Sequence, residues 1–131
     1  MLEQEKLVLV REQDVGCAQT FKFLLQSAGY SVRTVLDSQG FPADLAETPV
    51  AVITFWGTTP LGEEHPLYGL SSRAFCSACI SREIPFVIVT RWPHAVPEHF
   101  AERAAAVLEK VVDIQELCQI ISNLSSEADS V

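Results

Sequence analysis

The sequence predicts a three-layer α/β domain, in which helices cover both faces of a doubly wound, five-stranded parallel sheet. Three observations support this fold class. Segments suited to strands alternate with amphipathic helical segments five times along the chain. Three of the strand segments are apolar at nearly every position, as strands covered on both faces are. The chain has 131 residues, which suits one domain, and the alternation favours the strand order 2-1-3-4-5.

The first half of the chain supplies three of the strands. An apolar run at 7–10 predicts the first strand. A helix follows, because the residues from Ala18 to Ala28 are apolar at intervals of three and four, and Gly29 is suited to end it as a C-terminal cap. The same patterns predict the other elements of this half: a strand at 31–36, a short helix at 43–47 and a strand at 50–55.

The second half continues the alternation. It contains a loop at 57–69, a helix at 70–81, a strand at 85–90, a helix at 96–104 and a strand at 105–108. Asp113 is suited to cap the last helix, with Glu116 reaching back to form a capping box. The apolar face of this helix ends at Leu124. We therefore expect a domain over 1–124 and a flexible tail or the start of a linker over 125–131.

Charge and composition argue against several classes of partner. The net charge is −8, and the nine lysines and arginines are scattered, whereas a nucleic-acid surface needs a basic patch. No apolar stretch reaches the ~20 residues of a membrane helix, and the first residues are too polar for a signal peptide. We therefore expect a cytoplasmic protein that binds neither nucleic acid nor membrane.

The residues at the carboxyl ends of the strands are the candidates for a functional site, because ligands bind at that edge of a doubly wound sheet. Four of these strand ends carry such candidates: charged residues follow the first and fifth strands, an aromatic ring ends the third strand, and a hydroxyl residue ends the fourth. The five residues, called the strand-end site below, are Arg11, Glu12, Phe55, Thr90 and Lys110.

At these strand ends the sequence resembles the receiver domains of bacterial response regulators, over residues 6–124. The segment KLVLVREQ, from Lys6, stands where the family has Lys-Ile-Leu-Val-Val-Asp-Asp-Glu. The segment 84–90 is similar to the family's fourth strand and ends on its hydroxyl residue, Thr90. Leu-Glu-Lys at 108–110 resembles the family's Leu-x-Lys-Pro. The resemblance implies the receiver fold and a role in two-component signal transduction.

The resemblance fails at the phosphoacceptor pocket, which is degenerate in this chain. Arg11 stands at the family's first acidic position, and Phe55 stands at the aspartate that accepts the phosphoryl group. A phenyl ring can neither attack phosphorus nor bind Mg²⁺, and Glu12 alone is a weak cation site. We expect Arg11 to lie where the charge of the cation would be, paired with Glu12 or Asp14, and Phe55 or Trp56 to fill the pocket.

The resulting hypothesis is a pseudo-receiver, which signals through protein contacts without phosphorylation. It would not be an enzyme and would use no cofactor or metal. Receivers commonly signal through their fourth helix, fifth strand and fifth helix; the corresponding interaction residues here are Glu102, Arg103, Val107, Glu109 and Gln115. The partner would be a histidine kinase, an output domain or a second copy, which would make a homodimer.

A small-molecule or redox sensor on the same fold is the main alternative. Trp56 and Trp92 both follow strands at the functional edge and could line an aromatic pocket. Cys76 and Cys79 have Cys-x-x-Cys spacing, although they come late in a predicted helix, where buried thiols are expected. A flavodoxin-like enzyme is a weaker third reading, because nothing resembles a flavin phosphate loop.

Overall fold

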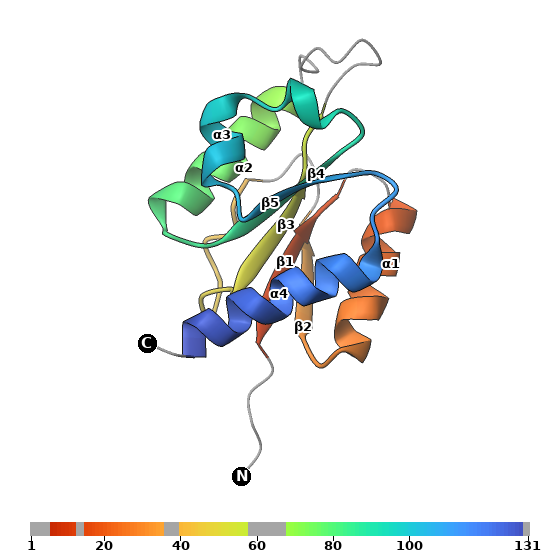
Figure 1. The fold of residues 1–131 in the computed structure, drawn as a ribbon. Coiled ribbons are helices and arrows are strands. Elements are labelled where there is room, and N and C mark those ends of the chain that lie inside the picture. The colour runs from red at the N-terminus through yellow and green to blue at the C-terminus, as the bar shows by residue number, and fades with distance from the viewer. Residues whose placement is uncertain (1–5, 13–14, 36–39, 58–67, 130–131) are drawn as a thin grey trace.

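The computed structural model describes residues 6–12, 15–35, 40–57 and 68–129. Strands and helices alternate along these residues (Figure 1). The strands are β1 (Leu7–Arg11), β2 (Ser31–Val35), β3 (Ala51–Phe55), β4 (Phe86–Thr90) and β5 (Ala106–Glu109). The helices are α1 (Val15–Ser27), α2 (Tyr68–Ser81), α3 (Glu98–Arg103) and α4 (Ile114–Asp129), with a 3₁₀ turn at Pro93–Ala95. None of the helices in the described ranges is both long and apolar enough to cross a lipid bilayer.

The five strands form one parallel sheet in the order β2-β1-β3-β4-β5, which confirms the predicted topology. Every residue of β1, β3 and β4 is buried, whereas the edge strands β2 and β5 are more exposed. The chain changes winding direction between β1 and β3. The carboxyl ends of these two strands therefore form the switch point at which doubly wound sheets bind ligands.

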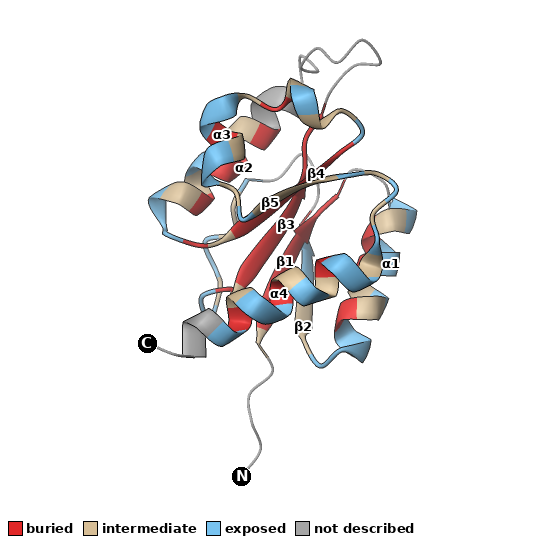
Figure 2. Cartoon of the chain, viewed as in Figure 1, coloured by how far each residue is buried: buried red, intermediate tan, exposed pale blue. Residues whose placement is uncertain are grey.

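The helices cover the sheet in two layers, with α2 and α3 on one face and α1 and α4 on the other (Figure 1). Side chains alternate along β1, so that Leu7 and Leu9 enter the core beneath α2 and α3, while Val8 and Val10 enter the core beneath α1 and α4. Figure 2 shows that the buried residues are concentrated on the central strands. The two cores explain why these strands are apolar throughout.

Side chains and glycine fix the ends of two helices as the sequence predicts. Gly29 follows α1 with a φ of 101°, and the N–H of Tyr30 donates to the carbonyl of Leu25 at 3.0 Å. At the start of α4, Asp113 Oδ1 accepts hydrogen bonds from the backbone N–H groups of the second and third residues that follow it, at 2.9 and 3.2 Å. The reciprocal bond expected from Glu116 is not formed among the described residues.

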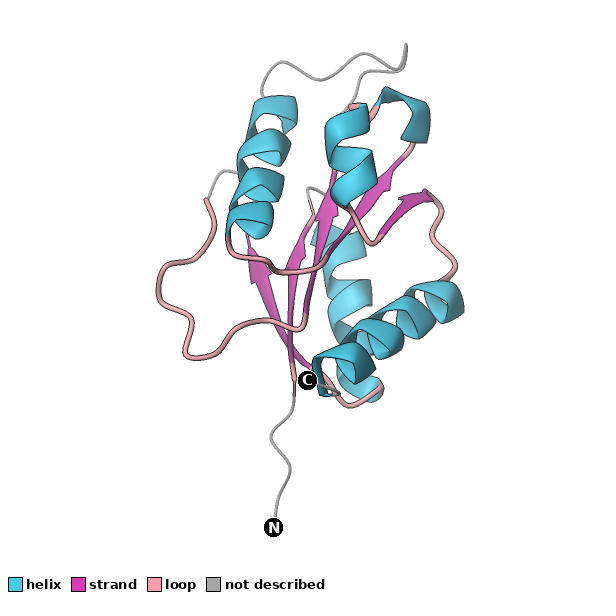
Figure 3. Cartoon of the chain, turned by 60° about the vertical axis from the view of Figure 1, so that its left-hand side comes forward, coloured by secondary structure: helices cyan, strands magenta, loops and turns pink. Residues whose placement is uncertain are grey.

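The predicted helix at 43–47 is wrong. The described residues before β3, 40–50, have no regular secondary structure and run as a long loop in Figure 3. Pro42 and Pro49 lie on either side of 43–47, and the stretch between them is too short to nucleate a helix without a packed apolar face. The loop packs on the core through Phe41, whose ring lies 5.4 Å from that of Phe75 in α2, and through Leu45.

The expected end of the last helix at Leu124 is also wrong, because α4 continues to Asp129. No glycine or proline interrupts the stretch 125–129. Ser125, the first residue of the predicted tail, is buried, and its carbonyl accepts a hydrogen bond from Lys6 Nζ at 3.2 Å. This contact joins the end of α4 to the residue before β1.

The burial of Trp56 leads to a prediction about stability. This side chain is only 2% exposed, and its ring lies 5.3 Å from that of Phe100 in α3. We expect Trp56→Ala to lower the free energy of unfolding by about 3–5 kcal/mol through the cavity it leaves. Urea unfolding measured by circular dichroism checks this, with Trp92→Ala as the control, because Trp92 is only half-buried. If the two variants lost the same free energy of unfolding, the packing of Trp56 in the core would be contradicted.

Candidate functional site

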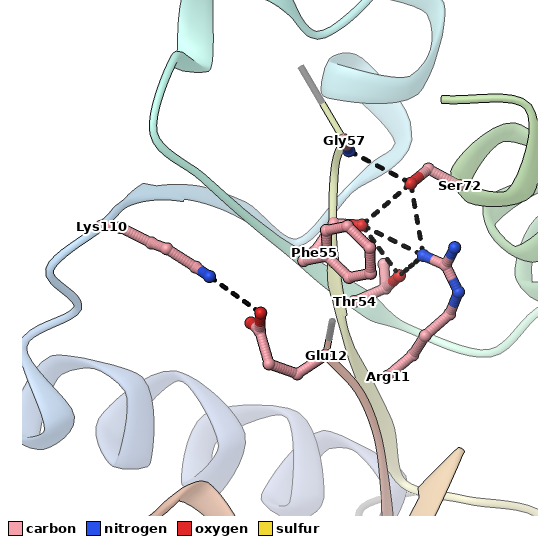
Figure 4. A network of polar contacts seen from close by, with 7 residues as sticks. All are labelled: Arg11, Glu12, Thr54, Phe55, Gly57, Ser72 and Lys110. Carbon is pink, nitrogen blue, oxygen red and sulfur yellow. Dashed lines mark hydrogen bonds and ion pairs between the residues drawn. The ribbon is translucent and has the colours of Figure 1, made fainter. Parts of the chain in front are cut away.

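The fold brings the five residues of the strand-end site to one edge of the sheet. Arg11, Phe55 and Thr90 are the last residues of β1, β3 and β4, while Glu12 and Lys110 directly follow β1 and β5. Figure 4 shows four of these side chains together with their neighbours. The assembly at the carboxyl edge is what parallel strands with aligned ends require.

Arg11 is completely buried at the end of β1. Its Nη1 donates to Oγ1 of Thr54 at 3.1 Å, to the carbonyl oxygen of Phe55 at 3.2 Å and to Oγ of Ser72 at 3.2 Å. The guanidinium carbon lies 4.7 Å from the centre of the Phe55 ring, within range of a cation–π contact. A buried charge needs such acceptors, since its desolvation is costly. Arg11 therefore connects β1, β3 and α2 (Figure 4).

Ser72 completes this network from α2. Its hydroxyl is buried and donates to the carbonyl oxygen of Phe55 at 3.1 Å, while the N–H of Gly57 lies 3.4 Å from the same hydroxyl oxygen. The sequence reasoning missed Ser72, because a serine within a helical pattern carries no signal of its own. The available signal was indirect: an arginine predicted at the end of a buried strand needs oxygen acceptors from whatever packs over it.

Glu12 and Lys110 form an ion pair, with 2.8 Å between Glu12 Oε1 and Lys110 Nζ. The Glu12 side chain is 2% exposed and that of Lys110 is 23% exposed. The pair joins the end of β1 to the loop after β5. The carboxylate of Glu12, which is the one acid among the five residues of the strand-end site, is thus bound to Lys110. Asp14, the other partner considered for Arg11, lies outside the described residues.

Phe55 and Trp56 are both buried, but they occupy different places. The ring of Phe55 stays at the strand-end site, against the guanidinium of Arg11. Trp56 belongs to the core beneath α2 and α3. The aromatic group at the expected phosphoacceptor position is therefore Phe55.

Comparison with solved structures identifies the architecture. A response regulator receiver domain from Clostridium thermocellum has a TM-score of 0.71 and 23% identity, over 95% of this chain and 97% of that one. A CheY-like receiver from Methanospirillum hungatei has a TM-score of 0.72 and 17% identity, over 98% and 100%. The chain has the receiver fold. Thermotoga maritima TrrA in complex with Mg²⁺–BeF has a TM-score of 0.67 and 18% identity, over 91% and 98%, and TrrA has also been solved with the histidine kinase ThkA. No family model and no curated protein matches the sequence.

Within this receiver fold, the described residues of the strand-end site do not fit a divalent cation. Mg²⁺ takes carboxylate oxygens and water as ligands. Here the guanidinium of Arg11 places a positive charge beside Phe55, and the carboxylate of Glu12 is engaged by Lys110. In the part of the chain that the structure describes, no three histidine, cysteine, aspartate or glutamate residues gather into a possible metal site.

Thr90 has a structural role in this receiver fold. Its buried Oγ1 accepts a hydrogen bond from the backbone N–H of Trp92 at 3.2 Å and so shapes the turn after β4. Trp56 and Trp92, the two rings that could line one aromatic pocket, have different surroundings: Trp56 packs in the core beneath α2 and α3, whereas Trp92 lines a groove whose described wall does not include Trp56.

The residues expected to form an interaction surface divide between two places. Glu102 and Arg103 are exposed on α3, and Glu109 is exposed at the end of β5, while Val107 is half-buried against the core beneath α2 and α3. Gln115 is exposed on α4, where it lines a groove shared with Ala28 and Tyr30, which follow α1. The structure thus groups the first four around α3 and β5 and sets Gln115 apart.

Cys76 and Cys79 lie buried in α2, and their thiols are free. Burial raises the pKa of each thiol to about 12, so both are neutral at physiological pH. Because the thiolate is the reactive form, this environment argues against a redox or metal-binding pair.

Replacing Arg11 tests the buried network. Arg11→Ala removes a donor shared by three oxygens, and we expect it to lower the free energy of unfolding by about 3 kcal/mol. Arg33→Ala is the matched control, since it removes an arginine whose ion pair with Asp44, at 2.9 Å, lies on the surface. In denaturant unfolding, the control should have a free energy of unfolding close to that of the wild type. A control as unstable as Arg11→Ala would show that burial of the guanidinium is not what matters.

Thiol labelling tests the environment of the cysteines. With a thiol-specific reagent at pH 8, we expect the half-buried Cys17 and Cys118 to react in the native protein. Cys76 and Cys79 should react only after denaturant is added, because burial holds the pKa of each at about 12. Peptide mass spectrometry after timed labelling identifies the modified residues. Early labelling of Cys76 or Cys79 would revive the redox hypothesis.

Proposed function

We propose that this domain is a receiver that works without phosphorylation, as a signalling module that binds another protein and catalyses no reaction. The single observation that carries the proposal is the packing of the Arg11 guanidinium over the ring of Phe55, at the position where the family resemblance places the phosphoacceptor aspartate.

Phosphoryl transfer to a protein needs a nucleophile and a cation that neutralises the charge on the transferring group. Phe55 offers no nucleophile. The guanidinium of Arg11 is charged at any accessible pH and is held by hydrogen bonds to β3 and α2. The permanent positive charge of Arg11 thus lies beside the position at which a receiver of the usual kind gains and loses the charge of a phosphoryl group. We infer that the end of β3, at Thr54 and Phe55, keeps one arrangement and does not alternate between two.

A domain with a fixed arrangement can still transmit a signal by presenting a constant surface. TrrA, which shares this fold, has been solved in complex with a histidine kinase. We propose that the partner of this chain is likewise a protein: a histidine kinase, an output domain or a second copy. Glu102, Arg103 and Glu109 are exposed around α3 and β5 and make this the surface that we assign to the partner.

Incubation with acetyl phosphate and Mg²⁺ tests the proposal directly. We expect the wild-type chain to gain no phosphoryl group, because no carboxylate occupies position 55. Phe55→Asp should also remain unlabelled, since the new carboxylate would lie beside Arg11, and it should cost about 1–4 kcal/mol of stability. Intact-mass spectrometry measures the outcome.

The double variant Arg11→Asp with Phe55→Asp, tested in the same assay, shows whether these two residues block phosphorylation. It places two new carboxylates beside Glu12, and we expect Mg²⁺-dependent labelling if these two residues are what blocks the chemistry. Labelling of wild type would overturn the proposal. A folded but unlabelled double variant would contradict the inference that Arg11 and Phe55 together form the block.

Photo-crosslinking in the native host tests the interaction. A crosslinkable residue at position 102 on α3 should capture the same protein whether or not acetyl phosphate is depleted, because the surface does not depend on phosphorylation. Position 19 serves as the control, since Gln19 is exposed on α1, on the other face of the sheet. Capture that requires phosphorylation, or equal capture from both positions, would count against the proposed surface.

A further inference from the structure

A second candidate site lies beside the strand-end site. It is a groove of about 790 Å³ between the first half of α1 and the loops that follow β4 and β5. Pockets for small molecules commonly have volumes of about 300–1,000 Å³ and are lined mainly by apolar side chains. This groove meets both conditions, since its wall includes Phe21, Trp92, Val112 and Ile114.

The rim of the groove leaves apolar surface in water. Val111 lines it and is 99% exposed, and Trp92, Val112 and Ile114 are only half-buried. Apolar side chains gathered on a concave surface favour the binding of a group that covers them. The body of the ligand should therefore be apolar and, because Trp92 presents an aromatic ring, preferably aromatic.

Charge at the rim indicates the polar part of the ligand. Arg91 is exposed, lines the groove and makes no hydrogen bond or ion pair with the described residues. Lys110 also lines the groove, but its Nζ is held by Glu12 at 2.8 Å. A guanidinium binds an oxygen acid, such as a carboxylate or a phosphate, through two parallel hydrogen bonds. Glu109, also at the groove, repels further negative charge, so a single acid group fits best.

We propose that this groove binds a small aromatic molecule that carries one acid group, with its ring against Trp92 and its acid group on Arg91. Such a site supplies the domain with an input that is independent of phosphorylation. The proposal does not depend on the identity of the protein partner or on whether the strand-end site can be phosphorylated.

The test uses two dyes that have the same aromatic ring system and differ in charge. Anilinonaphthalene sulfonate carries one acid group, and N-phenylnaphthylamine carries none. We expect both to bind the folded chain saturably and to shift the backbone amide NMR signals of Gly16, Thr20 and Val112, which line the groove. Arg91→Gln should weaken the sulfonate about tenfold, as the loss of one charge-assisted pair would, and leave the neutral dye unchanged.

Arg103→Gln is the matched control, because Arg103 is exposed but does not line the groove. It should leave the binding of both dyes unchanged. Thr20→Trp, which fills the groove from an exposed position on α1, should abolish the binding of both dyes while circular dichroism shows a native fold. The proposal is overturned if binding does not saturate, if the shifted amides lie elsewhere, or if Arg91→Gln and Arg103→Gln bind the sulfonate equally.

Discussion

The burial of one guanidinium is the constraint on which the functional edge of this domain depends. Arg11 is buried because it is the last residue of a strand that is otherwise apolar. Its charged guanidinium therefore needs hydrogen-bond acceptors inside the protein. The oxygens that satisfy it come from the end of β3 and from Ser72 in α2. This one side chain thus ties the end of β1 to the hydrogen bonds that Ser72 forms with the backbone of Phe55 and Gly57.

This constraint distributes the charges of the edge into two separate groups. The guanidinium of Arg11 lies on the face of the sheet beneath α2, where it donates to Ser72. The Glu12–Lys110 pair lies toward the loop that leads into α4. Adjacent residues of an extended chain point to opposite faces, so neighbouring positions 11 and 12 enter different surroundings. The separation leaves the carboxylate of Glu12 with a lysine and the ring of Phe55 with an arginine. Both are stable arrangements, and neither resembles a cluster of acids around a cation.

The sequence was sufficient for the topology and for the positions of the strand-end residues. Runs of apolar residues specify buried parallel strands, and strand ends then lie together by geometry. Details that depend on packing partners were not accessible in this way. The role of Ser72 follows from Arg11 packing beneath α2, and Trp56 packs against Phe100 of α3, which is distant from it in the sequence. The segment 43–47 lacks a helix because nothing in its few residues outweighs the cost of nucleation.

The irregular segment 40–50, before β3, also affects how the chain can change in length. Ala46, Glu47 and Thr48 are exposed and lie near Arg82 and Ile84, which precede β4, at the edge of the sheet opposite to Arg11. Doubling the length of a flexible loop costs only about 0.6 kcal/mol of closure entropy. An inserted peptide, or a whole folded module with adjacent termini, can therefore be accommodated at this point while the opposite edge keeps its structure. The receiver scaffold has here a natural place for fusion to other proteins.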